Sequence, residues 1–178
     1  MTEKTVSRKI IYEGRVLTLR VDDIILPDGK PATREVCDHP GGVAVLPLFD
    51  NGDVATVRQF RYPYMETLVE IPAGKLERGS GERPEDCALR ELREETGLVP
   101  DELRELGCLY PSPGYLNETL YLFLATGLRQ ERQALDEDEF LVVERVNFSV
   151  LRKMIADGDI RDAKTVAAVF KTAMLLGI

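Results

Sequence analysis

The sequence predicts an α+β protein in which short strands come first and a highly charged helix follows. Residues 6–60 contain several short β-forming runs separated by turn signals. The segment from Pro84 to Gly97 has helical spacing, with a proline in its first turn and a glycine at its end. Residues 150–176 again carry apolar side chains near helical spacing. This mixed order of strands and helices is typical of α+β folds.

The N-terminal half is expected to form strands. Leu26-Pro27-Asp28-Gly29-Lys30 is a turn signal, Asp50-Asn51-Gly52-Asp53 is a hairpin turn, and Gly41-Gly42 marks a boundary. We therefore expect an N-terminal β-domain over residues 1–40 and a main domain over residues 41–178. The strands expected between these signals cover residues 10–12, 16–21, 33–37, 42–49 and 54–60.

The C-terminal half alternates strands and helices in the same way. Strands are expected over residues 103–109, 119–125 and 140–146, and helices over 150–157 and 164–176. Residues 129–139 are polar and acidic, so we expect a surface loop there.

The helix over residues 84–97 carries the chemistry. Glu91, Glu94 and Glu95 are spaced i, i+3 and i+4, so their carboxylates share one face. Like charges placed in this way repel, and hard oxygen ligands suit Mg²⁺, with Mn²⁺ as an alternative. A solvated acidic surface helix with ordinary Arg–Glu pairs is the other interpretation of the helix taken alone.

Composition narrows the class of protein. The 178 residues carry a formal net charge of −8, which argues against nonspecific nucleic-acid binding and fits an enzyme that binds phosphates through cations. The cysteines Cys37, Cys87 and Cys108 show no paired spacing, so neither a disulfide framework nor a zinc site is indicated. No membrane span or signal peptide is apparent, so we expect a cytoplasmic protein without a membrane partner.

The segment before the helix adds a family resemblance. Glu82, seven residues, Arg90-Glu91, an aliphatic, any residue, Glu94-Glu95, any residue, Gly97 and an aliphatic match the signature of the Nudix hydrolase family. One departure is clear: seven residues separate Gly74 from Glu82, where the family has five. The position five residues on is occupied by Ser80, so we interpret the difference as a two-residue insertion in the glycine-rich loop.

The resemblance implies an α/β/α sandwich with a mixed sheet and a small N-terminal antiparallel β-domain that helps to form a homodimer. It implies metal binding by Glu91, Glu94 and Glu95, with the Ala73 carbonyl as a backbone ligand and Glu82 as a second-site ligand. Gly74, Arg90 and Gly97 would be structural residues of the motif.

Further segments resemble the ADP-ribose pyrophosphatase branch. Pro113 lies sixteen residues after Gly97 and is followed by Gly114 and Glu118, Arg58-Gln59-Phe60-Arg61-Tyr62 resembles a substrate segment, and residues 136–140 resemble an acidic catalytic loop. Each segment has an ordinary alternative. The segment around Pro113 can be a simple turn, Arg58 and Arg61 can be arginines at the rim of a site, and the acidic run can be a solvated loop. The residues assigned to substrate binding are Arg58, Arg61, Glu70, Pro113, Gly114 and Glu118.

The implied reaction is hydrolysis of the diphosphate of a nucleoside diphosphate sugar, with ADP-ribose giving AMP and ribose 5-phosphate. Glu139 is the first candidate for the catalytic base and Glu137 the second, while Glu94 belongs to both the catalytic and the metal sets. GDP-mannose or another sugar nucleotide is the alternative substrate, and a non-catalytic ligand-sensing module is the alternative class. Tyr12, Tyr62 and Tyr115 are candidates for base stacking, and His39 is expected in a structural turn.

Overall fold

A computed structural model describes residues 1–77, 79, 81–135 and 140–178. The described residues divide into two compact units, Met1–Gly41 with Tyr110–Thr119, and Gly42–Leu109 with Leu120–Ile178. The segment Tyr110–Thr119 therefore groups with the N-terminal strands, whereas the sequence analysis placed it within the main domain. Over the same described residues, no helix is long and apolar enough to cross a membrane.

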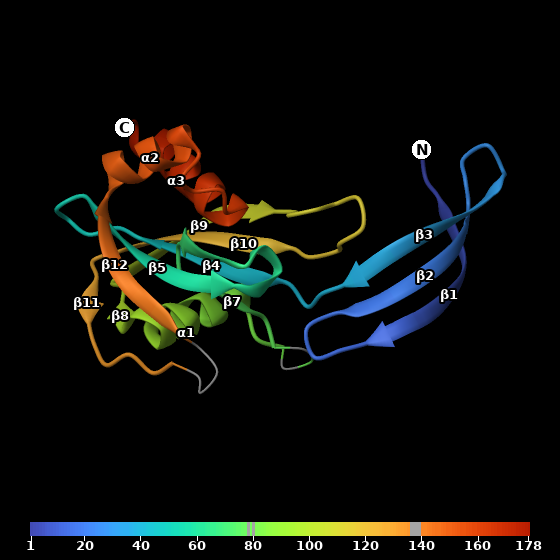
Figure 1. The fold of residues 1–178 in the computed structure, drawn as a ribbon, viewed down its shortest axis with the longest axis horizontal. Helices are drawn as coiled ribbons and strands as arrows, with labels where there is room; N and C mark the ends of the chain where they lie inside the picture. Colours follow the sequence, from blue (N-terminus) through green and yellow to red (C-terminus); the bar gives the residue numbers. More distant parts are fainter. Residues whose placement is uncertain (78, 80, 136–139) are drawn as a thin grey trace. The chain divides into compact units, whose positions relative to one another are not determined.

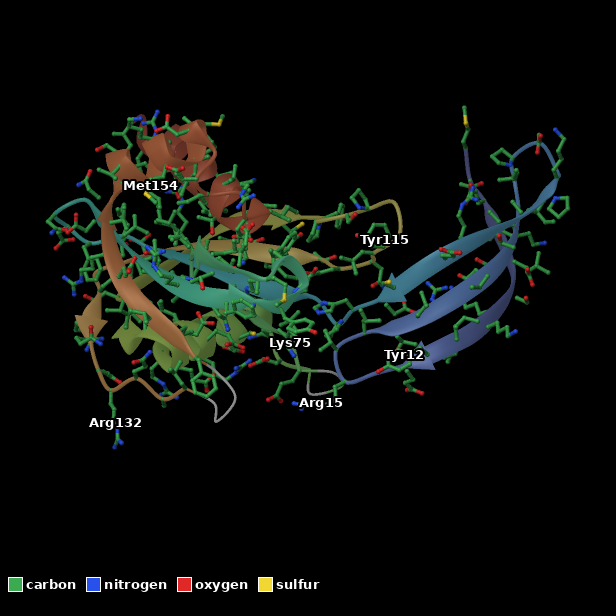
Figure 2. The ribbon with its side chains drawn as sticks, in the orientation of Figure 1. Tyr12, Arg15, Lys75, Tyr115, Arg132 and Met154 are labelled. Carbon is green, nitrogen blue, oxygen red and sulfur yellow. The ribbon has the colours of Figure 1, made fainter. Side chains whose placement is uncertain are left out.

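The first unit is an antiparallel sheet in the order β1-β2-β3 (Figure 1). Its strands are β1 (Lys4–Glu13), β2 (Thr18–Ile25) and β3 (Pro31–Asp38). Gly29 has φ +86° in the turn between β2 and β3, a conformation that glycine adopts without steric cost. Every residue of β1 is exposed, including Tyr12, which Figure 2 labels near the end of that strand.

The second unit is built on a mixed sheet in the order β7-β4-β10-β9, in which β4 and β10 are parallel and the other pairs antiparallel. Strands β12, β5 and β6 form an antiparallel sheet, and β11 pairs with β8. The strands of this unit are β4 (Gly42–Pro47), β5 (Asp53–Arg61), β6 (Glu66–Glu70), β7 (Ala73–Lys75), β8 (Leu98–Val99), β9 (Glu102–Leu109), β10 (Leu120–Thr126), β11 (Arg129–Gln130) and β12 (Leu141–Asn147).

Helices cover both faces of the mixed sheet. Helix α1 (Pro84–Thr96) lies on one side, and α2 (Phe148–Asp157) and α3 (Ala163–Leu176) lie on the other (Figure 1). Strand β4 is buried on both faces: Val43 and Val45 pack in the core beneath α1, and Ala44 and Leu46 in the core beneath α2 and α3. This alternation is what a sandwiched strand requires, and it confirms the expected α/β/α architecture.

The sequence analysis missed the segment that joins β5 to α1. A 3₁₀ turn, η1 (Tyr62–Tyr64), is followed by β6 and β7, none of which was expected. Pro63 and Pro72 bound these short strands, and proline signals favour a loop when only local sequence is considered. These residues form strands because β6 pairs with β5 and β7 pairs with β4, which are partners that local sequence does not reveal.

Candidate active site

The site is assembled where strand β7 lies against helix α1. A side chain at Gly74 would begin 1.8 Å from the Glu91 carboxyl carbon, so only glycine allows this approach. The backbone of Gly74 does not need a positive φ. The glycine is therefore required by the close contact with Glu91 and not by backbone conformation.

Helix α1 begins and ends as its sequence predicts. Pro84 occupies the first turn with Glu85 and Asp86, where negative charge is favourable. Gly97 follows the last turn with φ +70°, and its N–H donates to the Arg93 carbonyl at 2.8 Å. The helix thus presents Glu91 and Glu95 on its inner face, where they are 9% and 3% exposed.

A backbone hydrogen bond orients the more buried of these carboxylates. The Ala73 N–H donates to Glu95 Oε2 at 3.1 Å. The peptide between Pro72 and Ala73 is therefore fixed to the helix, and the Glu95 side chain has a defined direction.

Arg90 links the remaining carboxylates. Its guanidinium donates to Glu82 Oε1 at 2.9 Å, to Glu91 Oε1 at 2.8 Å and to Glu94 Oε2 at 2.9 Å. The hydrogen bond to Glu82 and the other carboxylates raise the pKa of Arg90, and in return Arg90 holds the pKa of Glu82 below its ordinary value. Glu82 thus remains next to the helix despite the two extra residues in the preceding loop.

Cys87 lies between helix α1 and strand β7 and is not reactive. Its thiol donates to the carbonyl of Lys75, the last residue of β7 (Figure 2), at 3.5 Å. Burial raises the pKa of Cys87 to about 12, so the thiolate is absent at neutral pH. Its role is to pack the helix against β7.

The oxygen ligands between strand β7 and helix α1 suit a hard divalent cation. Buried carboxylates beside a backbone segment, with the volume of a missing Cβ at Gly74, form a donor set of the kind Mg²⁺ prefers. As the side chains stand, no three acidic, histidine or cysteine residues of the described part of the chain are arranged as a complete metal site. Arg90, bonded to Glu82, Glu91 and Glu94, sets their present arrangement.

Of the predicted substrate residues of the second unit, Arg61 and Glu70 lie together and Arg58 lies apart from them. Arg61 forms a bidentate pair with the buried Glu70, both contacts being 2.7 Å. Arg58 is three residues away on β5, so its side chain leaves the opposite face, and it pairs with Glu144 of β12 at 3.1 Å. Arg61 is thus a partly exposed residue bonded to a buried carboxylate, whereas Arg58 is part of a cross-strand pair at the surface.

The other predicted substrate residues, Pro113, Gly114 and Glu118, belong to the first unit. Glu118 Oε1 lies 3.5 Å from His39 Nδ1. The Asn117 side chain accepts from the His39 N–H at 2.8 Å. His39 lies between β3 and β4, and the structural turn expected there stays a prediction.

The candidate bases Glu137 and Glu139 lie outside the described residues, as does Ser80, so their assignment stays a prediction.

Sequence reasoning missed a group of polar residues at the start of α3. Asp162 caps this helix, and Lys164 and Thr165 contact the end of β6 and the residue that follows it. An aspartate directly before a segment of helical spacing, as at Asp162, is a helix-start signal that could have placed the cap. Nothing local indicates that these side chains reach residues 70 and 71.

Comparison with protein families agrees with this geometry. A model of the NUDIX domain matches residues 38–169, and a model of the nucleoside diphosphate sugar hydrolase N-terminal domain matches residues 3–37. The chain belongs to the Nudix family. The Nudix signature is thus carried by helix α1 and the segment that precedes it, and the chain is a Nudix pyrophosphohydrolase, as expected from the motif.

Individual relatives cover nearly the whole chain. An ADP-ribose pyrophosphatase of Bacillus subtilis is 45% identical over 95% of this chain and 91% of its own length. A methanol dehydrogenase activator of Bacillus methanolicus is 42% identical over 94% and 90%. A GDP-mannose pyrophosphatase of Yersinia enterocolitica is 38% identical over 75% and 73%.

A solved structure supports the fold. The crystal structure of an ADP compounds hydrolase superimposes with a TM-score of 0.87 at 21% identity, covering 99% of this chain and 95% of that one. At this identity the likeness supports the Nudix fold and not a substrate.

Proposed function

We propose that this protein hydrolyses the diphosphate of a nucleoside diphosphate sugar, with ADP-ribose as the preferred substrate and Mg²⁺ as the cofactor. The observation that carries the proposal is the set of motif carboxylates Glu91, Glu94 and Glu95 on α1, of which Glu91 lies against Gly74 of β7. The relative named ADP-ribose pyrophosphatase, at 45% identity, favours ADP-ribose among the sugar nucleotides. The products would be AMP and ribose 5-phosphate.

Glu91, Glu94, Glu95 and the Ala73 carbonyl would hold the cation, with Glu82 available for a second one. When bound, a divalent cation neutralises the diphosphate and lowers the pKa of water. Mn²⁺ would be accepted by the same oxygen ligands.

The remaining residues orient and bind. Arg90 holds Glu82, Glu91 and Glu94 in place, because it already bonds all three. Arg61 is bonded to Glu70 through Nε and Nη2, so its Nη1 group, which the pair does not use, would contact the substrate. Glu139, with Glu137 as the second candidate, would accept the proton of the attacking water.

A substrate panel tests the proposal directly. The purified protein is incubated with Mg²⁺ and ADP-ribose, GDP-mannose or an oxidised nucleoside triphosphate, and release of AMP or GMP is measured. We expect fastest turnover of ADP-ribose. A clear preference for GDP-mannose would move the assignment to that alternative, which the GDP-mannose pyrophosphatase relative represents.

Glu95→Gln tests whether the acidic helix is catalytic. Gln retains an oxygen that can accept from the Ala73 N–H but removes the charge from a residue only 3% exposed. We expect kcat to fall by more than the roughly 10–100-fold that follows loss of a group supporting a metal ligand. Glu85→Gln, in the exposed first turn of the same helix, is the matched control and should keep wild-type turnover.

Unchanged turnover in Glu95→Gln would count against the proposed mechanism. A wild-type protein that turns over none of the substrates in the panel would favour the remaining alternative, a ligand-sensing module without catalysis. The chain retains every carboxylate of the Nudix signature. This argues against a ligand-sensing module, because a sensor needs no cluster of mutually repelling acids.

We also propose a homodimer formed through the N-terminal unit. Support comes from the matched N-terminal domain and from strand β1, an edge strand whose residues are all exposed. Long exposed edge strands with apolar side chains are sites of association.

A further inference from the structure

The connection between β6 and β7 is held by polar groups at the start of helix α3, which is far from it in sequence. The connection consists of Ile71 and Pro72, between Glu70 of β6 and Ala73 of β7. Because proline has no N–H, the amides next to it are those of Ile71 and Ala73. The Ala73 amide donates to Glu95, as described above.

The other amide is held by Thr165. The Ile71 N–H donates to Thr165 Oγ1 at 2.9 Å, and both residues are fully buried. The Thr165 hydroxyl donates in turn to Asp162 Oδ2 at 2.6 Å, and the Thr165 N–H donates to the same oxygen at 3.0 Å. Each hydrogen-bonding group of this threonine side chain therefore has a partner.

Lys164 adds a second contact between the start of α3 and the end of β6. Lys164 Nζ donates to Asp162 Oδ1 at 2.9 Å and also to Glu70 Oε2. Glu70 precedes Ile71 in the chain, so Asp162, Lys164 and Thr165 grip two consecutive residues of the connection. The Lys164 and Glu70 side chains are 12% and 2% exposed, which shields these contacts from water and salt.

The amides of Ile71 and Ala73 donate to groups on two different helices. One end of the connection is fixed to α3 and the other to the Glu95 carboxylate on α1. A shift of Ile71 would move Ala73, whose carbonyl and whose bond to Glu95 both belong to the proposed metal site. We propose that Thr165 is a positioning residue that sets Ala73 and Glu95 for cation binding. This inference rests on the proposed function.

Thr165→Val tests it, since valine keeps the shape but provides no acceptor for the Ile71 N–H. We expect the Mn²⁺ dissociation constant, measured by calorimetry without substrate, to rise about tenfold, as is usual for groups that support metal ligands. The kcat should fall by a similar factor, with a smaller change in KM because Thr165 does not contact substrate. Thr165→Ser, which keeps the hydroxyl, should restore both values.

Thr172 provides the matched control. It lies on the same helix, is equally buried, and its hydroxyl has no hydrogen-bond partner among the described residues. Thr172→Val should leave Mn²⁺ affinity and kcat unchanged. A folded Thr165→Val protein with wild-type affinity and kcat would overturn the inference.

Hydrogen exchange on the wild-type protein gives a measurement that does not depend on a variant folding. We expect Mn²⁺ to slow exchange at Ile71 and at residues 162–165 together; protection confined to α1 and β7 would contradict the proposal. Calorimetry and exchange need no turnover. A wild-type protein that binds Mn²⁺ but hydrolyses no sugar nucleotide would therefore remove the proposed function while still testing Thr165.

Discussion

The Glu70 carboxylate is buried between two cations, and its ionisation couples the stability of the fold to pH. Burial alone would raise the pKa of Glu70, but the hydrogen bonds and charges of Arg61 and Lys164 outweigh it. The pKa therefore lies below its ordinary value of 4.5. Asp162, bonded to the same Lys164, completes a cluster with balanced charge.

A carboxylate with a depressed pKa stabilises the folded protein above its ordinary pKa and loses that contribution as pH falls through the folded value. We expect Glu70→Gln to lower the free energy of unfolding by about 2 kcal/mol at pH 7, because two cations lose a buried partner. The difference from wild type should shrink as pH falls below 4.5. Urea unfolding at a series of pH values measures both effects.

Glu66→Gln is the control for this measurement. Glu66 pairs with Arg161, but its side chain is 48% exposed, so the pair should contribute less than about 1 kcal/mol. A Glu70→Gln protein that behaves like Glu66→Gln at every pH would show that the buried cluster does not stabilise the fold.

Among the elements, the close approach of Glu91 on helix α1 to strand β7 depends on one position. Gly74→Ala would place a methyl group about where the Glu91 carboxylate lies, with the nearest carboxyl atom at 1.8 Å. A carboxylate is the mobile end of a long side chain, so we expect Glu91 to turn away. Stability should change by less than about 1 kcal/mol, which is small among the effects of substitutions, while Mn²⁺ affinity and kcat fall strongly.

Lys75→Ala is the matched control, since Lys75 is exposed and its side chain leaves the opposite face of β7. Calorimetry, kinetics and thermal unfolding should all give wild-type values for it. Wild-type Mn²⁺ affinity in Gly74→Ala would mean that Glu91 does not bind the cation.

The elements also show what sequence alone can predict. Helix α1 was predictable because its signals are local: Pro84, Gly97 and the acidic face all lie within the segment. The contact between Ile71 and Thr165 joins residues 94 positions apart, and no local pattern encodes it. The pairing of Arg61 with Glu70 was missed for a related reason, because β6 exists only through its pairing with β5.

For the whole molecule, the exposed apolar side chains of strand β1 bear on the state of assembly. Val6, Ile10, Ile11 and Tyr12 of β1 are each at least 50% exposed. In a homodimer such side chains would be buried, because exposed apolar surface favours association. We expect the wild-type protein to sediment as a dimer and Ile10→Glu to shift it towards monomer, as measured by analytical ultracentrifugation.

Lys9→Gln, at the neighbouring exposed position, changes net charge by one unit and should leave the dimer intact. A wild-type protein that sediments as a monomer at every concentration would remove the dimer from the proposal.

The guanidinium of Arg90 gives the acidic helix a counter-charge of its own. Many small metalloproteins stay unfolded until their ion binds, because the binding free energy supplies the free energy of folding. Here a covalently attached cation already bonds Glu82, Glu91 and Glu94. We therefore expect a newly synthesised chain to complete its fold before any divalent cation binds.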